Sequence, residues 1–177
     1  MTFELGANSA IDGVPTAASQ IEVSRNDARV FITRTNASTP LTEGFGVRGP
    51  SGAYDVVFSR PKRTDVELLI VHPDGSGIRM FGNKRDTVAI RGAVRGDDVM
   101  LEGPGFEHAA LHLPAAGAPA TLFDGTRTLP IVVARFGGDI VVGIGWSGGE
   151  IAIGRYDFER GIATTVGPHG EGTETFH

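Results

Sequence analysis

Histidines and carboxylates are the side chains of this chain that could hold a metal. His108 and His112 are four positions apart, a spacing that would bring both onto one face of a helix. Their surroundings predict a strand, and at ~3.3 Å per residue the two side chains would then lie about 13 Å apart. One ion cannot bridge that distance, and Glu107 would point to the opposite face. We therefore expect no metal site and no cofactor.

Catalytic patterns are also missing from the sequence. Neighbouring carboxylates occur at Asp65/Glu67, Asp97/Asp98 and Asp157/Glu159. A glycosidase needs two carboxyl groups that face each other across a cleft, and neighbours in sequence are more typical of strand ends. The chain has no cysteine, and no serine stands in a GxSxG turn. We expect no catalysis by this chain alone, but an active site assembled from distant residues stays open.

The segment from Gly143 to Gly148 matches the pattern GxGxxG. In dinucleotide-binding proteins a helix follows this pattern, and its N-terminus holds the pyrophosphate. Here the residues that follow are typical of a strand. The pattern therefore does not predict nucleotide binding.

The segment Gly138–Asp157 predicts a β-hairpin. Two runs of alternating residues flank Gly148-Gly149, a dipeptide that can supply the two positive φ angles of a tight turn. The hairpin would place Trp146 opposite Ile151 on a bulky face. The other face would carry glycines, which are expected in strands where a backbone or a ligand approaches closely.

This hairpin supplies the first candidate ligand-binding group. Trp146 is either a core anchor or a platform for a flat ligand. The whole group consists of Trp146, Tyr156, Gly143, Gly145 and Gly154.

A basic region supplies a second candidate site, for an anionic partner. Residues 60–95 hold eight basic and four acidic side chains, whereas residues 96–177 hold four basic and eleven acidic ones. The alternative is an ordinary solvated strand surface. No aromatic platform is interleaved with the basic residues, so we expect no nucleic-acid partner. The candidates are Arg60, Lys62, Arg63, Lys84 and Arg85.

The remaining sequence predicts an all-β protein. About a dozen short strands are separated by regular turn signals, and no window shows helical periodicity. We expect one antiparallel β-sandwich domain over residues 1–177 with a possible N-terminal arm at 1–19; a small β-barrel is the alternative. Asp65–His72 reads as a central strand and Asn36–Gly52 as a long loop. Pro130 indicates a sheet edge or a bulge.

The motif Ile144-Gly145-Trp146-Ser147-Gly148 resembles a segment of family 36 α-galactosidases, in which Gln-Trp often follows. It lies late in their N-terminal β-supersandwich domain, and the resemblance covers about 40 of the 177 residues. Gly149-Glu150 stands where that family has Gln-Trp, and the chain ends at His177 before a catalytic barrel. The family's catalytic aspartates lie in that barrel, so the resemblance implies a carbohydrate-associated module without catalytic residues.

Three functional hypotheses follow. The first is a non-catalytic β-sandwich module that binds or accompanies carbohydrate. The second is a structural assembly protein, a component of a virion, a tail or a surface, which works as a homo- or hetero-oligomer of protein chains. The third is a small β-fold enzyme. No signal peptide and no apolar run of the ~18 residues of a membrane helix is visible, so a cytoplasmic location is the default and a virion or an assembled extracellular structure is the alternative.

Overall fold

The computed structural model describes most of the chain. The described residues are 2–4, 10–11, 14–15, 19–26, 29–36, 39–60, 65–82, 87–115, 118–167 and 170–175, with side chains described at 44–59, 65–82, 87–115 and 118–167. These residues form strands and turns and contain no helix, so the predicted all-β class is confirmed. In particular, the described segments include no helix long and apolar enough to cross a membrane.

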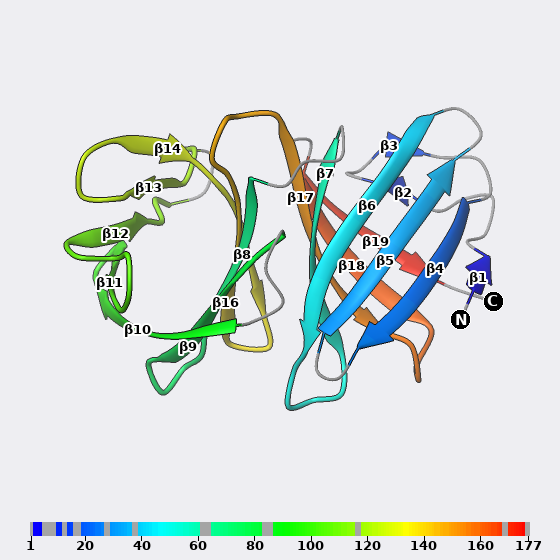
Figure 1. Ribbon diagram of the computed structural model, residues 1–177, viewed down its shortest axis with the longest axis horizontal. Helices are drawn as coiled ribbons and strands as arrows, with labels where there is room; N and C mark the ends of the chain where they lie inside the picture. The colour runs from blue at the N-terminus through cyan, green and yellow to red at the C-terminus, as the bar shows by residue number, and fades with distance from the viewer. Residues whose placement is uncertain are drawn as a thin grey trace.

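One antiparallel sheet has eight strands in the order β1-β4-β5-β6-β7-β17-β18-β19. It curls, and its end strand β1 lies at the right of Figure 1; a two-stranded ribbon of β2 and β3 lies beside the sheet. The strands are β1 (Thr2–Glu4), β4 (Ser19–Asn26), β5 (Arg29–Asn36), β6 (Thr39–Arg48), β7 (Tyr54–Arg60), β17 (Glu150–Asp157), β18 (Ile162–Gly167) and β19 (Gly170–Thr175), with β2 (Ala10–Ile11) and β3 (Val14–Pro15) in the ribbon. The arm expected at 1–19 thus includes β1, β2 and β3.

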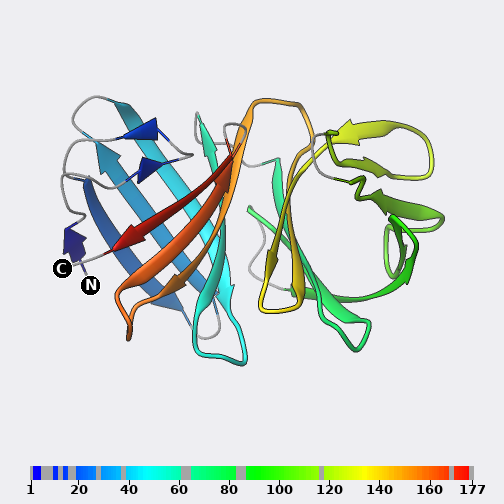
Figure 2. The ribbon, with the colours of Figure 1, turned by 180° about the vertical axis from the view of Figure 1, so that it is seen from behind.

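The second antiparallel sheet has nine strands in the order β14-β13-β12-β11-β10-β9-β8-β16-β15. It curls into a nearly closed barrel (Figures 1 and 2). Its edge strands β14 and β15 are joined through Ile131, so Pro130 does lie at a sheet edge. The strands are β8 (Val66–Val71), β9 (Ser76–Phe81), β10 (Thr87–Arg95), β11 (Asp98–Glu102), β12 (Ala109–His112), β13 (Thr121–Phe123), β14 (Thr128–Pro130), β15 (Val132–Phe136) and β16 (Asp139–Gly145).

The two sheets pack face to face, so their central strands are buried on both sides. Every residue of β8 is buried, and β8 lies between β9 and β16, which confirms the central strand expected at Asp65–His72. Val66, Leu68 and Ile70 face the eight-stranded sheet. Leu69 and Val71 face the inside of the barrel. A strand covered on both faces needs such a continuous apolar run.

Three apolar cores result from this layering. The interface core between the sheets includes Val57, Leu68, Ile70, Met80, Val141, Ile151 and Ile153. The barrel core inside the nine-stranded sheet includes Leu69, Val71, Ile90, Val99, Leu101, Phe106, Leu111, Ile140, Val142 and Ile144. The outer core on the far face of the eight-stranded sheet consists of Tyr54, Val56, Phe58, Ala152, Tyr156 and Ala163, with Phe158 packed against it.

The predicted hairpin at Gly138–Asp157 is wrong. Its two strands are β16 and β17, but β16 pairs with β8 and β15, whereas β17 pairs with β7 and β18. Gly148 and Gly149 do have the expected positive φ angles, 82° and 96°. Their turn carries the chain from one sheet to the other. Both strands are apolar on both faces, so each gains more burial inside its own sheet than from pairing with the other.

The loop predicted at Asn36–Gly52 is also wrong, because β6 occupies Thr39–Arg48. Glycines are a loop signal, but two of them lie within β6, where they permit close packing against the neighbouring strand. A side chain at Gly44 would lie 2.6 Å from the Phe58 ring, and one at Gly46 would collide with the carbonyl group of Asp55. Glycine in a strand often marks such a close approach.

Candidate functional site

The candidate glycines do not share one face. Gly143 and Gly145 point into the interface core, where a Cβ atom on Gly143 would lie 2.7 Å from Ile151 Cγ2. Gly154 lies on the opposite face of β17, and a Cβ atom there would meet the Tyr156 ring at 2.8 Å. The expectation that these glycines share one face of a hairpin is therefore wrong, because the strands that carry them belong to different sheets.

Tyr156 is fully buried in the outer core, with 0% of its surface exposed. Its ring lies 5.9 Å from the Phe58 ring and 6.0 Å from the Phe158 ring, measured between centroids. The structure thus places this candidate ligand-binding residue in the protein interior, away from any ligand that arrives from solvent.

Trp146 belongs to a buried polar cluster that covers one end of the barrel core. Its Nε1–H donates a 2.9 Å hydrogen bond to Glu67 Oε2. Glu67 is fully buried, and Arg79 binds both of its oxygens, at 2.6 and 3.2 Å. Burial raises the pKa of Glu67, although the hydrogen bond and charge of Arg79 act to lower it. The Arg127 guanidinium lies 5.6 Å from the centroid of the partly buried Trp146 ring.

Arg79 completes this closed end of the barrel. It donates a 2.7 Å hydrogen bond to the carbonyl group of Pro104, and its guanidinium lies 3.9 Å from the centroid of the Phe106 ring. Every charged group of the cluster therefore has a partner, as burial requires. The indole of Trp146 therefore has a structural role at this end of the barrel, through its contacts with Glu67 and Arg127.

The basic candidates fall almost entirely outside the described residues. Arg60 ends β7, and only its backbone is described. Lys62, Arg63, Lys84 and Arg85 lie in ranges that the structure does not describe. The anionic-partner site stays a prediction.

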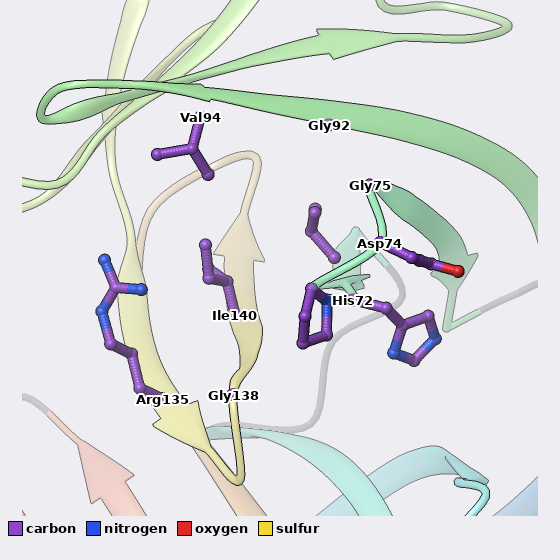
Figure 3. Close-up of a pocket in the computed structure, with 10 residues that line it drawn as sticks. His72, Asp74, Gly75, Gly92, Val94, Arg135, Gly138 and Ile140 are labelled. Carbon is purple, nitrogen blue, oxygen red and sulfur yellow. The ribbon is translucent and has the colours of Figure 1, made fainter.

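The opposite end of the barrel opens into a cleft, which we call the mouth cleft. Val71 of β8 pairs with Ile140 of β16 at this end, five ladder positions from the pair of Val66 and Gly145 at the closed end. The cleft has a volume of about 320 Å³ (Figure 3). Its lining includes Val71, Pro73, Gly92, Val94, Arg135 and Ile140.

Val94 shows that the inside of the barrel is accessible here. It pairs with Val99 across β10 and β11, and residues paired across strands project from the same face of a sheet. Val99 is 1% exposed in the barrel core, whereas Val94 is 64% exposed. Gly92, on the same face, passes so close to Val71 that an added Cβ atom would lie 2.7 Å from Val71 Cγ1. An inward-facing valine is thus left open to solvent at the mouth.

Two charged side chains stand at opposite sides of the mouth cleft. Arg135 pairs with Ile140 and so projects from the same face. It is exposed, and no described residue forms a hydrogen bond or an ion pair with its side chain. Asp74 accepts hydrogen bonds from the backbone N–H and Oγ of Ser76, at 2.9 and 2.6 Å, which hold its pKa below the ordinary value. Figure 3 shows the Asp74 side chain near His72, extending away from Ile140 and Arg135.

A charge network beside the mouth cleft holds the two sheets together. His72 Nδ1 lies 2.8 Å from Asp139 Oδ1, and Arg155 donates to Asp139 Oδ2, also at 2.8 Å. Arg155 further binds both oxygens of Asp55, at 2.7 and 2.8 Å, and the carbonyl group of Phe136 at 2.9 Å. Burial, with the charge of Asp139, raises the pKa of Asp55, although the hydrogen bond and charge of Arg155 act to lower it. For Asp139, burial also acts to raise the pKa, but the bonds from Arg155 and His72 outweigh it and the pKa is lowered.

A second cleft, the seam cleft, opens between the two sheets and measures about 520 Å³. Gly143 and Gly145 line it, together with Ile151 and two prolines, and no charged side chain contributes to its lining. Two candidate glycines thus line the seam cleft, whereas the other three candidate residues line neither the seam cleft nor the mouth cleft.

Sequence reasoning missed the residues of the mouth cleft. Val94 and Arg135 are 41 positions apart in an ordinary pattern of strand residues, and only the curling of the sheet brings them to one opening. Within the described ranges no group of three histidine or carboxylate side chains could hold a metal ion. His112 instead binds Asp98, with Nδ1 2.7 Å from Oδ1.

No family model, no curated protein and no solved structure matches this chain. The resemblance of Ile144–Gly148 to family 36 α-galactosidases stays a prediction.

Proposed function

We propose that this protein is a non-catalytic β-module that binds a small ligand in the mouth cleft. The observation that carries the proposal is Val94, an inward-facing residue of the barrel that is 64% exposed. The mouths of β-barrels are common ligand sites, and a volume of about 320 Å³ lies at the lower end of their usual range.

The surroundings of the mouth cleft support binding without catalysis. Its walls are strands and short turns, and the network of His72, Asp139 and Arg155 fixes the neighbouring chain segments. Asp74 is the one carboxylate in the lining, and the lining has no serine, threonine or lysine that could act as a nucleophile. A His–Asp pair is present, but nothing in the lining of the cleft offers it a proton to remove.

The expected carbohydrate ligand fits this cleft less well than an aliphatic one does. Sugar sites use aromatic faces, and the aromatic candidates lie elsewhere: Trp146 at the closed end of the barrel and Tyr156 in the outer core. The walls of the mouth cleft are instead aliphatic. Carbohydrate therefore enters the test as an alternative ligand.

Methyl-selective NMR of the whole chain tests the proposal. Octanol, octanoate and galactose are titrated separately, and the methyl signals of Val94 and Ile140 are followed. We expect saturable shifts of these signals with an aliphatic probe, lost in Val94→Trp. Ile162, a 40% exposed residue on β18 of the other sheet, is the control for non-specific contact. Equal shifts at Ile162, or no shifts at Val94 with any probe, would overturn the proposal.

A second candidate function is assembly with other protein chains, which the seam cleft favours. It is uncharged and lies along β15, an edge strand of the nine-stranded sheet in the described part of the chain. Exposed edge strands are templates for pairing with another chain. Light scattering after size exclusion tests this role: an oligomer that Val132→Asp converts to monomers supports assembly, whereas a monomer at every concentration contradicts it.

A further inference from the structure

We infer that the mouth cleft selects a small aliphatic acid, with the Arg135 guanidinium as the partner of the ligand's single carboxylate. This inference rests on the proposed function and names the ligand class. It depends on three features of the cleft: a guanidinium without a partner, aliphatic walls and a carboxylate at the far side.

Arg135 is positioned to meet a ligand. Its register with Ile140 places both side chains on the inward face of the nine-stranded sheet, and in Figure 3 the Ile140 side chain lies between Arg135 and His72. Arg79 and Arg155 bind carboxylates of this chain, whereas none of the described residues binds Arg135. A guanidinium presents a planar set of donors that matches a carboxylate in a bidentate pair.

The walls of the mouth cleft suit an aliphatic body. The branched or ring carbons of the walls come from Val71, Val94, Ile140 and Pro73. Gly92 has no side chain, so β10 can pass close to Val71. The lining contains no phenylalanine, tyrosine or tryptophan. Each methylene that leaves water for such a surface strengthens binding about fourfold. The affinity of a matching acid should therefore rise with chain length until the cleft is filled.

The charges around the cleft favour a single carboxylate at one end of the ligand. Asp74 stays ionised because Ser76 holds its pKa low, so a second anionic group at that side would be repelled. His72 Nδ1 is hydrogen-bonded to Asp139, and Asp139 also pairs with Arg155. This leaves Arg135 as the one cationic group in the lining without a carboxylate of its own among the described residues.

Calorimetric titration of the full chain tests the ligand class. The probes are hexanoate, octanoate, octanol, octylamine and octyl phosphate at one pH and ionic strength. We expect octanoate to bind more tightly than hexanoate and at least about tenfold more tightly than octanol, because a hydrogen bond to a charged group contributes roughly that factor or more. Octylamine should be the weakest, and octyl phosphate weaker than octanoate.

Arg135→Gln isolates the guanidinium. The variant should bind octanoate at least about tenfold more weakly and octanol unchanged. Arg95→Gln is the matched control, because it removes the same charge from β10, another strand of the same sheet, at a position next to Val94 that points to the other face. Its affinities should equal those of the parent. Both arginines are exposed, so circular dichroism and melting temperature should not change in either variant.

The outcomes separate this inference from the proposed function. Equal affinity for octanoate and octanol, with no effect of Arg135→Gln but loss of binding in Val94→Trp, would overturn the acid and leave the binding function in place. Tighter binding of octyl phosphate would show that the ligand class is wrong. Absence of binding by every probe would overturn the inference and the proposed function together.

Discussion

Arg155 of β17 and Asp139 of β16 connect the two sheets through a 2.8 Å hydrogen bond between Nη2 and Oδ2. These are the strands that a hairpin would have paired along their backbones. Instead, side chains link them at the end remote from their turn. Arg155 also binds the Phe136 carbonyl group, so it holds the turn that follows Arg135. The ion pair thus stabilises both the sandwich and one wall of the mouth cleft.

Replacing Arg155 should destabilise the protein strongly. Arg155→Ala would leave Asp55, which is 1% exposed, without its cationic partner. Removing one member of a buried pair costs about 3–5 kcal/mol, and we expect the lower end because the Arg155 side chain is 20% exposed. Urea denaturation followed by circular dichroism measures the change. The control is Arg160→Ala, which removes a 76% exposed arginine 4.0 Å from Asp157 and should cost less than about 1 kcal/mol.

The contribution of Asp139 to stability should depend on pH in one direction. Its pKa is below the ordinary 3.8 in the folded protein, so as the pH falls the unfolded chain takes up this proton first. Stability from Asp139 is therefore complete above about pH 5 and is lost as the pH falls below 3.8 through the folded pKa. The difference in unfolding free energy between the parent and Asp139→Asn should shrink over that window. A difference that grows on acidification would mean that the pKa is raised instead.

Loss of the indole N–H of Trp146 should lower the free energy of unfolding even when an aromatic ring is kept at this position. Trp146→Phe keeps a large aromatic side chain but removes the donor to the buried Glu67 carboxylate, so we expect a loss of about 1–3 kcal/mol. Since this is the only tryptophan, unfolding must be followed by circular dichroism and not by tryptophan fluorescence. Phe123→Leu is the control at a 41% exposed aromatic residue, and its cost should stay within about 0.5 kcal/mol. Equal effects of the two substitutions would show that Glu67 does not depend on the indole.

Gly143 should tolerate no side chain. An alanine Cβ there would lie 2.7 Å from Ile151 Cγ2 and 2.8 Å from Ile153 Cγ2, inside a packed interface core, and such overpacking costs about 1–3 kcal/mol. Gly49→Ala is the matched control, since its nearest neighbour would be the Ala53 carbonyl oxygen at 3.6 Å. Thermal unfolding of both variants checks this. If both variants melt at the parent temperature, the interface core accommodates the added methyl group and the predicted overpacking is wrong.

The sequence by itself determined the class of the fold and several local features. Alternating apolar residues and turn signals predicted strands, the run Asp65–His72 predicted a central one, and Gly148-Gly149 predicted positive φ angles. Pro130 predicted a sheet edge or a bulge, and it lies at an edge. Each of these follows from the preferences of a residue and its near neighbours, which any fold must respect.

Only the tertiary structure decided which strands pair and where the clefts form. A tight hairpin and a turn between two sheets need the same positive φ angles, so Gly148-Gly149 could not distinguish them. The choice depends on the apolar area that β16 and β17 bury against strands distant in sequence. The mouth cleft arises in the same way, because the registers of Val94 with Val99 and of Arg135 with Ile140 place these side chains at one opening. No local pattern carries that information, since strand register is set by burial summed over the whole sheet.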